Sequence, residues 1–524
     1  MTGARAAVKL CGVLAFAVCA VASGESVSRP EPLDSDLRPD DVEKRPYIDY
    51  ARECVELIIK HGTDRYGKVH SPILMNILDV RTRTCPADPL PVDERFRVIR
   101  RGRRGPGGAN LYLDQPTIRT MVALTRVTGD PKYAEFAKKS LSYYLTHLVD
   151  EKGLFWWGYH RHYDAHKDVM TGHSGNVHEI HIEQAAWPIL WDVNPQAVTR
   201  EIQAIWTWHV IDKTTGEINR HADGRRGCDF AMTGGEILNA FAFLYTKTRD
   251  AKWLDRARRV ANYYWRSRHP VTALIPNRPN AGNARFDGSH FDTSITGLLC
   301  HRLLKAYELT REPIFRDQAV TYLRAYAKLG YDARAKRFWG SLALDGTPVR
   351  GPRVPKGYAA YEPRGHIDMW QPYIAGYEHP MRTAQAYAHA YALTKDETLL
   401  ATAEQWADCI RRAWPPRTCN AKTWYAHYAK HRIGHGTYAS HYGRTISFLL
   451  HMHALTRDPD YLRFARTVAT EAVSKLYYQG LFRGHPAKPY YEAADGVGYL
   501  LRALVQLDQV LKGADTTKLP FENC

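Results

Sequence analysis

A helix-hairpin pattern recurs along the 524 residues of this chain and restricts its fold more than any other feature. In each copy an apolar helical stripe runs into a short polar turn, and a second stripe follows. The copies read ALTRVTGDPKYAEFA (123–137), FLYTKTRDAKWLDRA (243–257), KAYELTREPIFRDQA (305–319), HAYALTKDETLLATA (389–403) and HMHALTRDPDYLRFA (451–465), with a degenerate copy PILWDVNPQAVTREI (188–202). The pattern predicts six helix hairpins in an all-α fold.

The turns of these hairpins share a Thr-x-Asp sequence or a close variant, often followed by proline. An Asp or Asn side chain caps the N-terminus of the second helix, and proline is well tolerated in the first helical turn. We therefore assign these acidic residues, such as Asp250 and Asp458, a structural role and no catalytic one.

The hairpins recur at intervals of about 55 to 85 residues, between a single helix near 46–61 and another near 496–512. If the two terminal helices pair, the chain closes as an (α/α)7 toroid. An (α/α)6 barrel and an open solenoid are the alternatives. We predict one toroid domain over residues 43–512, a flexible segment over 23–42 and a C-terminal tail over 513–524.

The connections between hairpins are long and irregular, whereas the turns within them are short. Short turns must then lie on one rim of the toroid and long connections on the other. The long connections carry most of the unusual side chains, and they run over 155–178, 212–227, 269–292, 330–379 and 415–441. Because long loops in a compact fold are usually functional, we expect the site on that rim.

The first 22 residues have the features of a secretory signal peptide. Arg5 and Lys9 precede an apolar run from Leu10 to Ala22, which is too short to span a bilayer. The residues before Cys19 fit a lipoprotein cleavage site poorly, so we expect no membrane anchor. The sequence predicts export to the periplasm or the extracellular space.

The net charge of +17 favours an anionic partner. An export signal and the lack of a nucleic-acid-binding motif point away from nucleic acid and toward an anionic polysaccharide. A charge that serves only solubility is the alternative. Seven cysteines remain after the leader, among which Cys409 and Cys419 could pair, and we expect a monomer.

Two histidines and a glutamate from three separate loops or helix ends form a candidate metal site: His160, Glu179 and His221. The spacing predicts that Glu179 lies in the first turn of a helix, on one face with Ile182 and Glu183. Nitrogen and oxygen ligands suit a divalent cation such as Mn²⁺, with Ca²⁺ less suited. Histidines that serve only the core or the surface are the alternative.

The FWWGYH segment, the VHE segment and the Arg220-His221 pair occur in an order that resembles polysaccharide lyase family 2, the pectate lyases with an (α/α)7 barrel. The motif match covers Trp156 to His221, and the toroid pattern covers most of the chain. The resemblance implies that His160, Glu179 and His221 hold a transition metal and that Arg220 is the base. It also implies a second active-site arginine, for which Arg285 is the first candidate and Arg364 and Arg382 are rivals.

Such lyases remove the C5 proton of a 4-linked uronate and expel the glycosidic oxygen from C4. A divalent ion and arginines neutralise the carboxylate, which otherwise opposes removal of the proton. Arginine is an unusual base because it is almost always protonated, and nearby positive charges would disfavour its charged form. Tyr163 and His178 are the alternative bases.

Substrate contacts are predicted at Trp157, Arg285, Arg364 and Trp370. The tryptophans could stack on sugar rings, and the alternative is that they are core residues. Arg364, His366, Asp368 and Trp370 stand at every second position, as expected for residues on one face of an extended loop. A histidine-rich segment, HYAKHRIGHGTYASHYGR over 427–444, predicts a basic wall rather than a second metal site.

These observations predict an exported lyase that cleaves an acidic 4-linked uronan by metal-assisted β-elimination. Polygalacturonate is the first candidate substrate. An α/α-barrel glycoside hydrolase is the alternative enzyme, with Glu179 and either Asp229 or Asp368 as its paired carboxylates. Sugar 2-epimerases share the α/α barrel, but an export signal fits them less well. A glycan-binding solenoid without activity is the non-enzymatic alternative.

Overall fold

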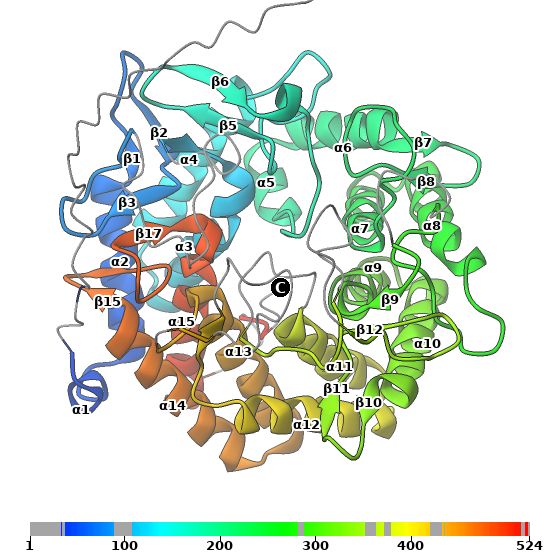
Figure 1. Ribbon diagram of the computed structural model, residues 1–524. Helices are drawn as coiled ribbons and strands as arrows, with labels where there is room; N and C mark the ends of the chain where they lie inside the picture. Colours follow the sequence, from blue (N-terminus) through cyan, green and yellow to red (C-terminus); the bar gives the residue numbers. More distant parts are fainter. Residues whose placement is uncertain are drawn as a thin grey trace, which may run out of the picture.

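The computed structural model describes residues 33, 37–87, 107–280, 288–351, 363–370, 379–419, 432–433, 435–514 and 519–521. Its helices stand in a ring around a central axis, with one layer of helices inside a second layer (Figure 1). The predicted all-α toroid is confirmed. No helix among the described residues combines the length and the low polarity needed to cross a bilayer.

The helices follow the predicted hairpin order, and both terminal helices lie within a residue of their expected bounds. They are α1 Pro39–Val42, α2 Tyr47–His61, α3 Leu111–Thr128, α4 Lys132–His147, α5 Trp187–Val193, α6 Pro195–His209, α7 Ala231–Thr248, α8 Ala251–Arg266, the π-helical turn η2 Ile295–Cys300 that leads into α9 His301–Thr310, α10 Pro313–Gly330, α11 Pro380–Thr394, α12 Glu397–Arg412, α13 Ala439–Thr456, α14 Pro459–Leu476 and α15 Val497–Leu511.

The hairpin turns explain the Thr-x-Asp pattern. In the turn from α7 to α8, Arg249 takes the left-handed conformation (φ +58°) that ends α7. The Thr248 hydroxyl accepts a hydrogen bond from the Asp250 N–H, and the Asp250 side chain accepts one from Lys252. The same chemistry recurs at Asp396 and Asp458. Each turn is thus stabilised locally, without help from the rest of the ring.

Short antiparallel strands decorate the long connections. They pair as β1 Thr63–Asp64 with β2 Ser71–Leu74, β3 Ile77–Asp79 with β17 Tyr490–Glu492, β4 Gly108–Ala109 with β5 Arg161–Asp164 and β5 with β6 Val169–Gly172, β7 Val210–Asp212 with β8 Glu217–Ile218, β9 Phe291–Asp292 with β12 Ser341–Leu342, β10 Tyr331–Asp332 with β11 Arg337–Phe338, β13 Thr418–Cys419 with β14 Arg432–Ile433, and β15 Tyr477–Tyr478 with β16 Leu481–Phe482. These strands hold the connections in place at the rim where the inner helices begin.

The ring closes where the last helix meets the first ones. Helix α15 packs on α2, α3 and α13, and β17 pairs with β3. The α15–α3 approach is close because Gly498 lies directly on the backbone of Pro116 and Thr117. The choice between seven and six repeats stays a prediction, because α5 has only seven residues.

Cys409 is a buried free thiol whose Sγ contacts the carbonyl oxygen of Lys336. The disulfide between Cys409 and Cys419 that the sequence left open is therefore not formed in this structure. Residues 1–22, which carry the predicted signal peptide, lie outside the described residues.

Replacing Gly498 by alanine tests the ring closure. A Cβ atom at this position would lie 2.4 Å from the backbone nitrogen of Thr117, so α15 and α3 must separate. We expect the free energy of unfolding to fall by about 1–3 kcal/mol, although alanine is the better helix former. Urea denaturation measures it. Ser142→Ala, at an exposed position of α4, is the control and should change stability by less than about 0.5 kcal/mol.

Candidate metal centre

Three segments far apart in the sequence lie side by side at the centre of the candidate site. Glu179 forms a parallel bridge with Gly158 and an antiparallel bridge with His221. Backbone hydrogen bonds from Ile180 to the Arg220 carbonyl and from Ala222 to the His178 carbonyl, both 3.0 Å, hold the second contact. This small sheet fixes the positions from which the predicted ligands project.

The prediction of a helix at Glu179 is wrong. The backbone is extended there, and α5 begins only at Trp187. Pairing with the segment around Arg220 takes the N–H and C=O groups that a helix would use internally. The apolar spacing that suggested a helical face reflects burial of Ile182 instead.

The side chains of His160, Glu179 and His221 converge. The Nε2 atom of His160 lies 3.0 Å from Oε2 of Glu179, and Nε2 of His221 lies 3.5 Å from Oε1. One potential ligand atom from each residue lies within 4.8 Å of the others. An ion about 2.1 Å from each donor, with bond angles of about 90–110°, needs donors about 3.0–3.5 Å apart. The donor set suits a divalent transition metal, and both histidine-to-carboxylate distances lie within this range.

Arg220 completes the group. Its Nε atom donates to Oε1 of Glu179 over 2.9 Å, and Nη2 contacts the same oxygen. The guanidinium also lies 4.9 Å from the centre of the Phe230 ring. Burial would raise the pKa of Glu179, but the charge of Arg220 and the two histidines hold that pKa well below its usual value. The carboxylate is thus ionised and able to act as a ligand.

A directed hydrogen-bond chain lies beneath the three segments. The Asn219 carbonyl can only accept, so Nδ1 of His209 donates to it over 2.8 Å. Nε2 of His209 then accepts from Nδ1 of His178 at 2.7 Å, and Nε2 of His178 accepts from the Trp157 indole at 2.8 Å. Burial lowers the pKa of His209 to about 3, which keeps it neutral and its tautomer fixed.

This series of hydrogen bonds holds residues that are neighbours of the candidate site residues in the sequence. His178 precedes Glu179, Trp157 lies in the loop that carries His160, and Asn219 precedes Arg220. The Asn219 side chain also accepts from the backbone N–H of His221 over 2.8 Å. The sequence did not indicate the roles of His209 and Asn219. His209 ends α6 outside any motif, and nothing in the sequence around Asn219 marks its side chain as a partner of the His221 backbone.

The same hydrogen bonds show that the prediction of His178 as an alternative base is wrong. His178 is fully buried, and both of its ring nitrogens have partners in the chain. Tyr163, the other alternative base, donates its hydroxyl to Asp168. His178 is therefore not in a position to take a proton from a substrate, and the role of Tyr163 as a base stays a prediction.

The tryptophans predicted to bind substrate lie in the core. Trp157 is 2% exposed, and Trp370 is 1% exposed with its indole bonded to the Ala413 carbonyl. Neither ring has a free face for a sugar, so the predicted stacking role is wrong for both. They are the core aromatics that the alternative interpretation described.

The predicted arginines have different positions. Arg285 lies outside the described residues. Arg364 is half-buried in a loop, where it donates to the Arg350 carbonyl, and its role in substrate binding stays a prediction. Arg382 lines a cavity together with Glu183, four residues after Glu179.

The carboxylates considered for a hydrolase are held elsewhere. Asp229 accepts from the Tyr263 hydroxyl at 2.6 Å and from the Asn280 backbone at 2.8 Å. Asp368 accepts from the Trp370 backbone. Neither lines the cavity that contains Glu183.

Comparison with known proteins identifies the family. A family model described as periplasmic pectate lyase matches residues 105–229 and 285–521, which include His160, Glu179, Arg220 and His221. The chain belongs to the periplasmic pectate lyase family. A pectate disaccharide-lyase from Dickeya dadantii (strain 3937) is 26% identical over 197 residues. That alignment covers 32% of this chain and 36% of the relative, so the chain matches about a third of the relative's length.

Solved structures with related shape are more distant from this pectate lyase family member. Cellobiose 2-epimerase from Bacillus thermoamylovorans B4167 is 9% identical, with a TM-score of 0.47 over 89% of this chain and 99% of that one. A family 76 glycoside hydrolase from a bovine Bacteroides thetaiotaomicron strain is 14% identical, with a TM-score of 0.47 over 90% and 79% of the two chains. At these levels the similarity supports no inference about activity.

Replacing His209 by phenylalanine tests the hydrogen-bond chain. A planar aromatic ring is kept, although the phenyl ring is larger than the imidazole; His178 loses an acceptor and the Asn219 carbonyl loses a donor. Each unsatisfied buried group costs about 1–3 kcal/mol, so we expect the free energy of unfolding to fall by at least about 2 kcal/mol. Denaturant titration measures this. His147→Phe, at an exposed position of α4, should change it by less than about 0.5 kcal/mol. Equal effects of the two substitutions would contradict a stabilising role of these hydrogen bonds.

Proposed function

We propose that this protein is an exported lyase that cleaves a 4-linked uronan by metal-assisted β-elimination, with polygalacturonate as the first candidate substrate. The observation that carries the proposal is the convergence of His160, Glu179 and His221 with Arg220 on the rim of the toroid. Membership of the periplasmic pectate lyase family supports the reaction class and the periplasmic or extracellular location. We propose that it acts as a monomer, without nucleic acid and without a membrane anchor.

His160, Glu179 and His221 are the proposed metal ligands, and Mn²⁺ is the proposed ion, with Ca²⁺ as the alternative. The two imidazoles favour a transition metal, because Ca²⁺ prefers oxygen ligands. When bound, such an ion supplies positive charge that neutralises the substrate carboxylate. His160 is the most accessible of the three, with 11% of its side chain exposed, so we expect substrate to approach from its side.

In the proposed reaction the C5 proton leaves, its electron pair forms the C4–C5 double bond, and the C4–O bond breaks. The electrons of that bond leave with the glycosidic oxygen, which takes up a proton from water. Arg220 is the proposed catalytic residue. The family resemblance makes it the acceptor of the C5 proton, a role that requires the neutral guanidine. The positive charge that Arg220 gains with the proton then stabilises the negative charge that develops on the substrate.

The electrostatics of Glu179 and Glu183 do not suit the acid of a hydrolase. A glycoside hydrolase needs a carboxylic acid with a raised pKa to protonate the leaving oxygen. Burial would raise the pKa of Glu183, as it would that of Glu179, but in both cases nearby arginines hold the pKa below its usual value. Both residues are therefore ionised, and neither can be the acid of a hydrolase at neutral pH.

Metal dependence is the direct test of the proposal. We expect polygalacturonate to yield a product that absorbs in the ultraviolet, because the new double bond is conjugated with the carboxylate. EDTA should abolish the signal and Mn²⁺ should restore it. Reducing ends without ultraviolet absorbance would show a hydrolase instead, and the absence of both would favour a binding protein.

Calorimetric titration with Mn²⁺ is the control for this experiment, because it needs no substrate. His160→Ala should weaken Mn²⁺ binding by at least about tenfold, since it removes one of three ligands. His70→Ala, at an exposed position away from the ligands, should leave the affinity unchanged.

Arg220→Ala tests the catalytic assignment. We expect kcat to fall by about 100-fold or more, as when a charge-stabilising group is removed from an active site. Arg225→Ala is the matched control, because Arg225 belongs to the same basic segment but is exposed. It should keep nearly full activity. Full activity of Arg220→Ala would overturn the assignment even if the protein is a lyase.

A further inference from the structure

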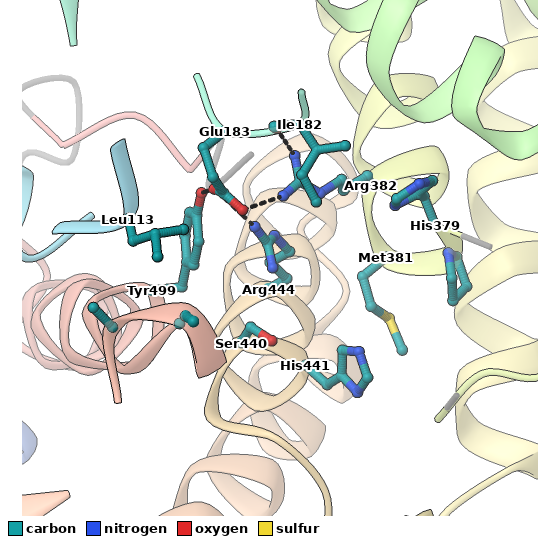
Figure 2. A pocket seen from close by; sticks show the side chains of 14 residues that line it. Leu113, Ile182, Glu183, His379, Met381, Arg382, Ser440, His441, Arg444 and Tyr499 are labelled. Carbon is teal, nitrogen blue, oxygen red and sulfur yellow. Dashed lines mark hydrogen bonds and ion pairs between the residues drawn. The ribbon is translucent and has the colours of Figure 1, made fainter. Parts of the chain in front are cut away.

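The arginines of this rim have two kinds of surroundings. In the cavity beside Glu183, Arg382 and Arg444 both face the carboxylate, at 3.5 Å and 3.9 Å (Figure 2). The surface at the hairpin of β10 and β11 instead has several cations that are exposed to solvent. They are Arg334, Lys336 and Arg337 of the hairpin and Arg350 and Arg412 beside it, and we call these residues the basic patch.

The hairpin positions the basic patch at the rim that also holds the candidate metal centre. β10 follows the last turn of α10, and β11 pairs with it in antiparallel register. Lys336 takes the left-handed conformation (φ +51°) in the turn between the two strands. The connection then leads to α11, so it lies two hairpins further round the ring than the connection that carries Arg220 and His221 (Figure 1).

Arg412 joins the basic patch from α12. Its guanidinium donates to the Lys336 carbonyl and contacts the sulfur of Cys409 at 3.4 Å. Burial raises the pKa of Cys409, and the positive charges of Arg412 and Arg337 act against this rise. Arg337 and Arg412 therefore lie close to the same thiol, although they belong to different elements.

Arg350 joins the basic patch through an aromatic stack. The rings of Trp339 and His366 are stacked with their centres 3.8 Å apart, and the Arg350 guanidinium lies 4.7 Å from the centre of the Trp339 ring. Burial lowers the pKa of His366, and the charges of Arg337 and Arg350 lower it further, so both arginines lie near this imidazole. Arg337 is also held by the Ile367 carbonyl, to which Nη2 donates over 3.1 Å.

Within the part of the chain that the structure describes, no carboxylate forms an ion pair with a member of the basic patch. Asp332 is opposite Arg337 in the hairpin register, but its carboxylate is bonded to Nε2 of His366 at 3.0 Å. Asp408 lies one turn before Arg412 on α12 and is exposed, without an ion pair to it. Neighbouring like charges repel one another, so the patch is suited to an anion that lies across it.

The exposure of the basic patch favours a long anionic chain over a small anion. A single exposed ion pair contributes little affinity, because water and salt screen it. A molecule that makes several such contacts at once is held more firmly. Guanidinium groups also bind carboxylates through paired hydrogen bonds. A uronan, which carries a carboxylate on each unit, meets these requirements.

We propose that the basic patch is a second binding surface for the anionic polysaccharide, separate from the metal centre, and that it holds long chains on the rim of the ring. This inference rests on the proposed function for the identity of the polysaccharide. Binding at the patch raises the concentration of the chain near the metal centre, as a second contact on one molecule does. The patch should therefore matter for polymers and not for short oligomers.

Kinetics with long and short substrates test the inference. In the triple variant Arg337→Gln, Arg350→Gln and Arg412→Gln, we expect KM for polygalacturonate to rise by about fivefold or more at low salt, because several exposed contacts are lost. kcat should not change, since the patch does not contact the reacting unit, and kcat/KM for a galacturonate trimer should not change either. The difference in KM should shrink as NaCl is raised from about 20 to about 500 mM, because salt screens exposed charges.

A variant with the same loss of charge elsewhere is the control. Arg126, Lys138 and Lys139 are exposed cations of α3 and α4, and replacing all three by Gln should leave KM for the polymer within about twofold of wild type. The triple variant with Lys at the three arginines of the patch keeps the charge and should keep most of the affinity for the polymer. If the triple Gln variant does not fold, Arg350→Gln decides the matter, because this side chain is exposed and its loss should still raise KM for the polymer by about twofold.

The outcomes separate this inference from the proposed function. A wild-type protein that neither binds nor cleaves any uronan would contradict the proposed function itself. Cleavage with the same polymer KM in the triple Gln variant and the wild type would overturn the inference alone. An equal rise in KM for polymer and trimer would also overturn it, because the substitutions would then act on the metal centre. So would a loss of binding to phosphatidylglycerol vesicles without a change in polymer KM, which would show a membrane-binding surface instead.

Discussion

The direction of the hairpins decides where this protein can perform chemistry. Every short turn ends an inner helix and begins an outer one, so all long connections gather at the opposite end of the ring. The Thr-x-Asp turns, such as the one at Arg249, enforce this arrangement through local hydrogen bonds. The candidate metal centre and the cavity that Arg382 and Glu183 line lie at the end where the inner helices begin.

At that end a single carboxylate organises the centre. Glu179 contacts Arg220, His160 and His221, and the backbone on either side of it pairs with the segments that carry Gly158 and His221. A buried carboxylate is tolerable only because these partners compensate its charge. The same carboxylate thereby fixes the positions of the other three side chains.

The sequence predicted the hairpins well because their determinants are local. Turn residues and apolar stripes can be read from 15 consecutive residues, and α2 and α15 begin and end almost where expected. The three candidate ligands also come together, as the order of the motifs predicted. The conformation at Glu179 was not predictable, since the partner segment lies about 40 residues away. Burial of Trp157 and Trp370 likewise depends on packing between distant segments.

Closure of the ring has a consequence for how the protein acquires its structure. Helix α15 packs on α2 and α3, and β17 pairs with β3, so segments more than 350 residues apart share one interface. Contacts of such sequence separation form late, because the intervening chain must first become ordered. A chain that ends before α15 leaves the inner faces of α2 and α3 uncovered. The closed ring therefore depends on nearly the entire chain, although every proposed ligand lies in its first half.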